Sequence, residues 1–102
     1  MLPMAVHLHV AHLIWDEWNR EHIAKHQVVP AEAEDVAAGD PAIRATYKGR
    51  FQLIGPTRAG RMLSVVVGPV PNQQDVYYVF SARPAHRSER RYFEQQQGGQ
   101  TP

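Results

Sequence analysis

The sequence contains no cysteine, which excludes disulfide bonds, thiolate metal sites and cysteine nucleophiles. It also lacks a long apolar run: the longest, Met62–Val67, is interrupted by Ser64 and is far too short to cross a bilayer. No basic segment of the kind that begins a signal peptide stands at the N-terminus, where His7, His9 and His12 interrupt the apolar residues. We therefore expect a protein of the cytoplasm.

The 102 residues are enough for one small domain with short terminal extensions, but not for a second core. Hydrophobic residues make up 43% of the chain and charged residues 21%, which is ordinary for a globular protein and excludes a disordered or fibrous one. The net charge of +1 conceals a division, because residues 1–40 carry −5 and residues 41–102 carry +6. This asymmetry indicates either a polyanionic partner for the basic part or attraction between the two parts.

Hydrophobic periodicity predicts a strand, two helices, four strands and a final helix. Asp16 is the expected N-cap of the first helix, which ends near His26, and Pro30 opens the second helix. The expected ranges are strand 5–14, helices 17–26 and 31–38, strands 42–47, 50–55, 61–68 and 76–82, and helix 84–95. This order predicts an α+β fold: an antiparallel sheet of four to five strands, flanked by N-terminal helices and a C-terminal helix.

Four arginines stand within nine residues at and just before the start of the final helix. Arg83, Arg87, Arg90 and Arg91 fall on one half of the helix, and Tyr92 lies on the opposite side. One arginine guanidinium can donate hydrogen bonds to two phosphate oxygens at once, so this face indicates phosphate binding. A solvated helix face with salt bridges is the alternative that the pattern leaves open.

Further arginines stand in the predicted strands and their connections. Strand alternation places Arg50 on the side of Gln52, and Arg61 begins a strand just after Arg58. The same alternation places Arg83 on the face of Tyr77, Val79 and Ser81. Arginines that converge at one sheet edge would form a phosphate site, but alternation along single strands does not show whether they converge.

His22 and His26 lie one turn apart on the first helix, with Lys25 beside them. Such groups can exchange a proton with a ribose hydroxyl. The spacing also fits a pair of metal-binding histidines, although no HExxH pattern accompanies it. Two structural roles, in helix packing and in hydrogen bonding at the helix end, are the remaining interpretation.

Two separate parts of the sequence resemble the BrnT-type toxin family. The first covers Ile14–Glu34, including the stretch His22–Val28, and the second covers Ser81–Glu94. Between them, Gly60–Val66 resembles the central strand of that family. The resemblance covers residues 13–94 and makes residues 1–12 an N-terminal extension, expected to form an extra strand, and residues 95–102 a flexible tail.

The resemblance implies a RelE-like ribonuclease fold and the toxin half of a type II toxin–antitoxin pair. It implies an endoribonuclease that needs neither metal nor cofactor, and a DNA-binding, BrnA-like antitoxin as partner. The catalytic residues would be Lys25, His26, Arg61 and Arg83. RNA would be bound by Arg50, Arg58, Arg87, Arg90 and Arg91, while His22 and Tyr92 would serve in acid–base chemistry or in packing.

The sequence departs from the family in three places. Gln27 replaces the glycine that usually follows the lysine–histidine pair, so we expect the helix to end without a left-handed cap. Residues 1–12 have no counterpart, and an edge strand, a dimer contact or a start codon assigned too early would each explain them. The loop Gly68–Asp75 contains two prolines. A non-catalytic RNA- or protein-binding module and a homodimer formed through the N-terminal strand remain alternatives.

Overall fold

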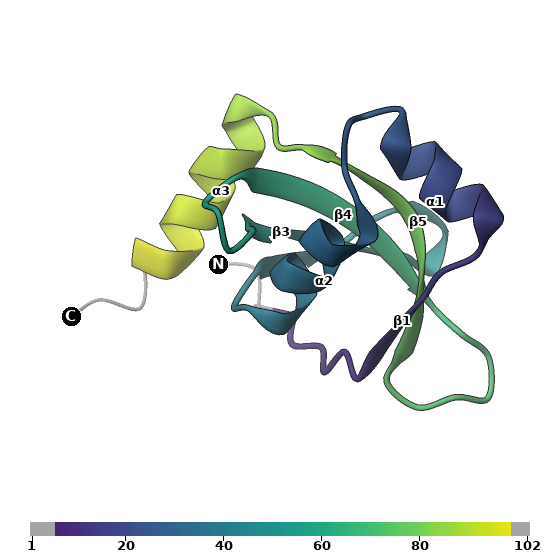
Figure 1. Ribbon diagram of the computed structural model, residues 1–102. Coiled ribbons are helices and arrows are strands. Elements are labelled where there is room, and N and C mark those ends of the chain that lie inside the picture. Colours follow the sequence, from purple (N-terminus) through teal and green to yellow (C-terminus); the bar gives the residue numbers. More distant parts are fainter. Residues whose placement is uncertain (1–5, 99–102) are drawn as a thin grey trace.

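The computed structural model describes residues 6–98, and residues 1–5 and 99–102 lie outside that range. Its elements follow the predicted order (Figure 1). They are β1 (His12–Ile14), α1 (Glu17–Ala24), α2 (Pro30–Ala38), β2 (Ala42–Ala45), the 3-10 turn η1 (Tyr47–Gly49), β3 (Phe51–Pro56), β4 (Met62–Pro69), β5 (Val76–Pro84) and α3 (Arg87–Gly98). None of the helices within residues 6–98 is long and apolar enough to cross a membrane.

One five-stranded sheet, in the order β1-β5-β4-β3-β2, confirms the predicted α+β class. Strands β2 to β5 form an antiparallel meander, as their short connections predict. β1, in contrast, pairs with β5 in parallel, with Leu13 opposite Tyr77. A pattern of short hairpins defines only neighbours along the chain, so it could not indicate the direction of this pair.

Both ends of the described chain differ from the predicted elements. The N-terminal strand is limited to His12–Ile14, and residues 6–11 form no regular structure. The alternation in this segment reflects burial, because Leu8 and Val10 pack against the core while His7 and His9 are exposed. At the other end α3 continues to Gly98, through residues assigned to the tail, and the remainder of that tail lies outside the described residues. The division at residues 12 and 94 stays a prediction.

The helices cover the two faces of the sheet unequally. α2 packs on β3 and β4, and Ala33 and Val36 join the buried core on what we call the inner face. α3 packs on β2 and β3 from the opposite side, the outer face, and α1 lies along β5 (Figure 1). Because α3 reaches only one end of the outer face, the surface beside β5 and the start of β3 is left for the site described below.

A bulge in β5 corrects the predicted face of Arg83. Val66 pairs with Ser81, but the next residue, Val67, pairs with Val79, so Phe80 is an extra residue in the strand. Val79 therefore points into the inner core, whereas Ser81 and Arg83 point to the outer face. The prediction that Val79, Ser81 and Arg83 share a face was wrong, because the inserted residue interrupts the alternation of side chains between the two faces of the sheet.

Candidate functional site

A groove of about 500 Å³ lies on the outer face where α3 does not cover the sheet. α1 forms one wall, η1 and the residue after it, Arg50, form another, and β4 and β5 form the floor. The lining residues are Trp18, His22, Tyr47, Arg50, Val66, Tyr78, Phe80 and Ser81. We call this site the aromatic groove; of its described lining side chains, Arg50 is the one with a permanent charge.

Arg50 lies over an aromatic ring on the floor of the groove. Its guanidinium carbon is 3.5 Å from the centre of the Phe80 ring and 5.7 Å from that of Tyr47. Gly68 makes this arrangement possible, because a Cβ atom there would stand only 2.8 Å from the Phe80 ring. The bulge at Phe80 and the missing side chain at Gly68 together present a cation on an aromatic floor.

The wall formed by α1 carries a stack of two rings. Trp18 and His22 lie parallel, with ring centres 4.8 Å apart and planes inclined by 9°. The His26 ring meets His22 edge-on at 6.2 Å, so one of the predicted acid–base residues lies beside the groove. Trp18 remains 56% exposed despite this stacking, and Tyr47 on the facing wall is 64% exposed.

Buried hydrogen bonds hold α1 against the edge of β5. Asn19 is completely buried and donates from Nδ2 to the carbonyl oxygens of Ile14 and Val79. The Asp16 side chain accepts a hydrogen bond from the Asn19 amide, which is the largest of several effects that lower the pKa of this carboxyl. Tyr78 donates its hydroxyl proton to Asp16, and desolvation followed by this bond raises the Tyr78 pKa. The predicted cap at Asp16 is thereby confirmed, and it fixes the wall that carries Trp18 and His22.

The end of α1 corrects the expectation for Gln27. This residue has φ of 60°, the left-handed conformation that glycine usually adopts at a helix end. Its amide donates to the carbonyl of Ala24, and the amide of Val28 donates to that of Ile23. Buried Val28 and Ile23 both belong to the core, so the apolar contact of a Schellman motif forms with a non-glycine residue and overrides the backbone preference.

Arg61, which directly precedes β4, binds the backbone of this turn. Nη1 donates to the Gln27 carbonyl at 2.7 Å and to both carboxylate oxygens of Glu32 at 3.1 Å. Nη2 lies 3.4 Å from the carbonyl oxygen of His26. Arg61 is therefore close to the backbone of the predicted catalytic pair, and its guanidinium is engaged with α2 and with the turn.

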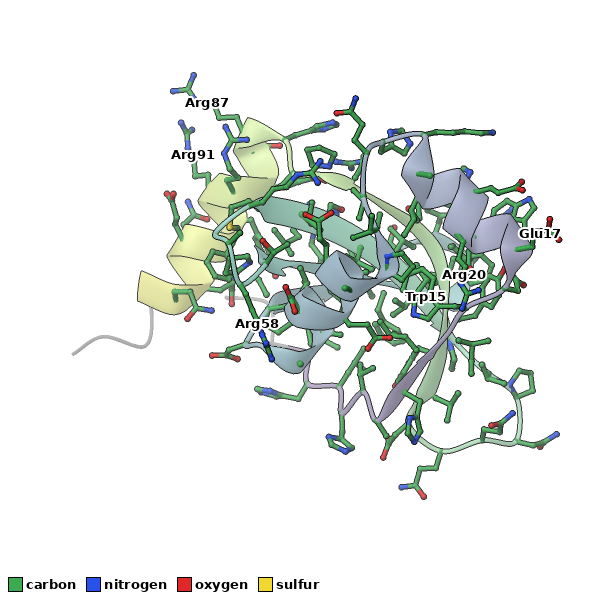
Figure 2. The ribbon with its side chains drawn as sticks, viewed as in Figure 1. Trp15, Glu17, Arg20, Arg58, Arg87 and Arg91 are labelled. Carbon is green, nitrogen blue, oxygen red and sulfur yellow. The ribbon has the colours of Figure 1, made fainter. Side chains whose placement is uncertain are left out.

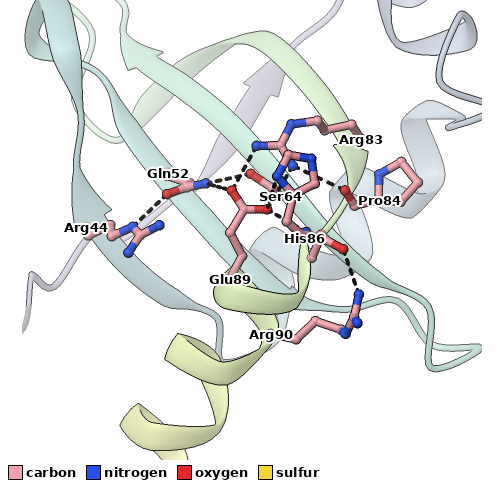
Figure 3. Close-up of polar contacts among 9 residues, drawn as sticks. Arg44, Gln52, Ser64, Arg83, Pro84, His86, Glu89 and Arg90 are labelled. Carbon is pink, nitrogen blue, oxygen red and sulfur yellow. Dashed lines mark hydrogen bonds and ion pairs between the residues drawn. The ribbon is translucent and has the colours of Figure 1, made fainter.

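Arg83 belongs to a polar cluster beneath the start of α3 (Figure 3). Its Nη1 and Nη2 atoms each donate to one Glu89 carboxylate oxygen at 2.8 Å, and Nη1 also donates to the Pro84 carbonyl. Glu89 further accepts from the His86 amide and from Gln52, each at 2.7 Å. Arg83, followed by the His86 amide, lowers the Glu89 pKa to about 2 against the effect of burial, and Glu89 raises the pKa of Arg83.

The same cluster extends across the sheet to Tyr92. Gln52 donates to Ser64 at 2.8 Å and accepts from Arg44 at 2.7 Å. The Arg44 guanidinium lies 4.5 Å from the centre of the Tyr92 ring, and Tyr92 is half-buried. This contact favours the packing role for Tyr92 over a chemical one.

The remaining predicted RNA-binding arginines do not converge on one point. Arg87 and Arg91 extend from the start of α3 away from the sheet (Figure 2), and Arg90 donates to the Ala85 carbonyl at 2.8 Å. Arg58 is separate from them, since its backbone amide donates to Asp35 of α2 and its side chain lies 3.7 Å from the same carboxylate. Lys25 is exposed at the end of α1.

The two interpretations of the charge division both have support. Two ion pairs, Arg58–Asp35 and Arg61–Glu32, join the basic part to the acidic part. Within residues 6–98, the other arginines of the groove and of α3 form no ion pair with a carboxylate; these are Arg50, Arg87, Arg90 and Arg91. The fold thus neutralises part of the basic surface and leaves another part exposed.

The sequence pattern predicts His22, His26 and Arg50 as functional residues, but not the aromatic residues that form most of the groove. Trp18 was detectable, because it precedes His22 by one helical turn. Phe80 was not, because its position depends on the bulge. In the described part of the chain, no group of three or more histidine and carboxylate side chains is placed to hold a metal ion.

A protein-family model described as the ribonuclease toxin BrnT of type II toxin–antitoxin systems matches residues 15–89, a range that includes every lining residue named for the groove, and also Arg83 and Glu89. The chain belongs to this family. Its fold is also that of the Brucella abortus ribonuclease toxin BrnT, known from a 1.1 Å crystal structure. The TM-score is 0.58 and the identity 28%, over 74% of this chain and 97% of the Brucella chain. A comparison with curated proteins gave no match.

The BrnT assignment confirms the family resemblance and the α+β fold expected from it. Since the family consists of ribonuclease toxins, RNA is the target and an antitoxin the partner at the level of the family. The RelE-like relationship and the individual roles of the site residues stay predictions.

Proposed function

We propose that this BrnT-family chain is an endoribonuclease of the cytoplasm that cleaves RNA without a metal ion and thereby inhibits translation and growth. The observation that carries the proposal is the aromatic groove, where Arg50 lies beside His22 and the aromatic rings. A cation, a proton-transfer group and stacking surfaces are what an RNA strand needs from a binding site.

Arg50 binds a phosphate of the RNA strand at the floor of the groove. The exposed arginines of α3, together with Arg58, hold the phosphates of flanking nucleotides; those of α3 are Arg87, Arg90 and Arg91. Contacts of this kind release counterions, so affinity falls as the salt concentration rises.

Cleavage proceeds by attack of a ribose 2′-hydroxyl on the adjacent phosphate, which releases the 5′-oxygen of the next nucleotide. His22 in its neutral form accepts the hydroxyl proton, and His26 or Lys25 in its protonated form donates a proton to the leaving oxygen. The products are a 2′,3′-cyclic phosphate and a 5′-hydroxyl, so no water and no metal enter this step. The edge-on contact of His22 with His26 supports this assignment of acid and base.

Arg83 stabilises the charge that develops on the phosphate. Glu89 engages Nη1 and Nη2, whereas Nε and the second Nη2 proton have no hydrogen-bond partner among the described residues. That side edge can donate two hydrogen bonds to a phosphate. Arg61 acts instead as a positioning residue, through its bonds to the backbone of His26 and Gln27.

The test is cleavage of single-stranded RNA by the purified chain in the presence of a metal chelator. We expect products that end in a cyclic phosphate, and a rate at least tenfold lower for each of Arg50→Gln and His22→Gln. Growth on induction of the wild-type gene, compared with the double variant Arg61→Ala/Arg83→Ala, tests toxicity. Equal growth of both strains, with no cleavage by the purified wild type, would refute the enzymatic function.

A non-catalytic RNA- or protein-binding module is the second candidate. The ion pairs of Arg61 with Glu32 and of Arg83 with Glu89 favour it, because each carboxylate already neutralises its arginine within the fold. Salt-dependent RNA binding without cleavage would support this candidate over the enzyme.

We further propose a DNA-binding, BrnA-like antitoxin whose acidic segment covers the exposed arginines of α3 and the groove. Inhibition of cleavage by the protein encoded next to this gene tests that role. A homodimer formed through the N-terminal segment is tested by the mass in solution, with and without residues 1–12.

A further inference from the structure

We infer that the aromatic groove selects unpaired nucleotides, whose bases stack on Trp18 and on Tyr47. The inference rests on the proposed function only in that RNA occupies this groove. It adds two residues that determine the class of RNA: single-stranded segments bind, and duplex does not.

The first observation is the exposure of two large aromatic rings on opposite walls. Trp18 is 56% exposed and Tyr47 is 64% exposed, although each carries apolar area that folding usually buries. His22 supports one face of the Trp18 ring by parallel stacking. Tyr47 stands at the start of η1, where Lys48 and Gly49 both have positive φ, so a strained turn holds the ring at the rim.

The second observation is the charge of the groove between these rings. Among the lining residues within the range 6–98, Arg50 alone has a permanent charge, and none is Asp or Glu. A cation between two stacking surfaces matches a phosphate between two bases. An acidic protein segment could pair with the cation, but its carboxylates would not stack on either ring. The volume of about 500 Å³ lies in the range of pockets that hold small ligands, which suits one or two nucleotides.

The bases of a duplex are stacked on each other and cannot lie against Trp18 or Tyr47. Unpaired bases can turn outward and stack on protein rings, which is the usual basis of single-strand recognition. The groove should therefore bind a single strand more tightly than the same strand paired with its complement.

The experiment measures binding of a fluorescent 2′-O-methyl oligoribonucleotide of about ten nucleotides, a length typical of single-strand sites. This probe lacks the attacking hydroxyl, so binding is measured without cleavage. We expect Trp18→Ala and Tyr47→Ala each to weaken binding by about 5- to 150-fold, the range for losing one stacked base. Trp18→Phe and Tyr47→Phe should retain most of the affinity. Val29→Ala, an exposed apolar truncation outside the groove, is the matched control and should change nothing.

A direct readout comes from tryptophan fluorescence. The chain has two tryptophans, and Trp15→Phe leaves Trp18 alone. Stacking of a base should then quench the remaining emission as the single strand is added. Equal affinity for duplex and single strand, or alanine variants within twofold of the wild type, would overturn the inference.

The outcomes also separate the two proposals. If the probe binds through Trp18 and Tyr47 but unmodified RNA is never cleaved, the enzymatic function fails and the stacking inference stands. If RNA is cleaved and the alanine variants bind normally, the stacking inference fails alone. Loss of antitoxin binding in these variants, with RNA binding unchanged, would likewise assign the groove to a protein partner and overturn it.

Discussion

Glu89→Gln tests whether one carboxylate fixes α3 to the sheet. Glu89 accepts hydrogen bonds from Arg83, Gln52 and the His86 amide, and its side chain is only 7% exposed. A glutamine of nearly the same shape would present an NH₂ group to Arg83 or to Gln52, where both partners are donors. The variant therefore removes the negative charge and leaves at least one donor facing another donor.

The magnitude follows from the pKa of Glu89, which is about 2 in the folded protein against an ordinary value of 4.5. A difference of this size corresponds to about 3 kcal/mol of folding free energy at neutral pH. Because the folded-state pKa is the lower one, this contribution is complete above the unfolded pKa. It is lost as the pH falls from about 4.5 through about 2, and about two-fifths of it remains at pH 3.

Urea unfolding of the wild type and of Glu89→Gln at pH 7 and at pH 3 measures this contribution. We expect the variant to be less stable by about 3 kcal/mol at pH 7, with the gap narrower by about 2 kcal/mol at pH 3. The other carboxyl groups titrate in both proteins, so the change in the gap isolates Glu89. Glu94→Gln, an exposed change on the same helix, should have little effect. A gap below about 1 kcal/mol at pH 7, or a gap independent of pH, would refute the reasoning.

Three further changes test the turn at Gln27, the floor of the groove and the Arg61 contacts. Gln27→Gly should raise the unfolding free energy by about 0.5–1 kcal/mol, whereas Gln27→Ala keeps the unfavourable φ and should not; urea unfolding compares them. Gly68→Ala should lower stability by about 1–3 kcal/mol and weaken RNA binding in an anisotropy titration, because its Cβ displaces the Phe80 ring. Arg61→Ala should cost about 1–2 kcal/mol, and Glu32→Ala alone should cost less, since it leaves the bonds to the turn.

The parts of the fold that were predictable are those with local signals. The Asp16 cap, Pro30 at the start of α2 and the glycine- and proline-rich connections each act over a few residues, and the observed elements agree with them. The parallel pairing of β1 with β5 depends on residues that are about 64 positions apart, and no local signal encodes it. The final helix, expected to end at Gln95, continues to Gly98, and the side-chain amide of Gln97 donates to the Asp40 carbonyl.

The candidate site shows the same distinction. His22 and His26 follow from helical spacing, and Arg50 follows from strand alternation. Phe80 could not be placed, because a single inserted residue reverses which side chains face the groove. Gln27 shows the converse case: a buried contact between Val28 and Ile23 imposes a conformation that the residue itself disfavours, so its identity was a misleading signal.

Arg83 combines two roles that a single substitution cannot separate. Its bonds to Glu89 fix the start of α3. The position of α3 in turn decides which part of the outer face stays uncovered. Loss of cleavage in Arg83→Ala would therefore follow equally from lost charge stabilisation or from a displaced helix. Glu89→Gln displaces the helix contact while retaining the guanidinium. If Glu89→Gln still cleaves RNA and Arg83→Ala does not, the difference must come from the guanidinium itself, which would place Arg83 at the phosphate.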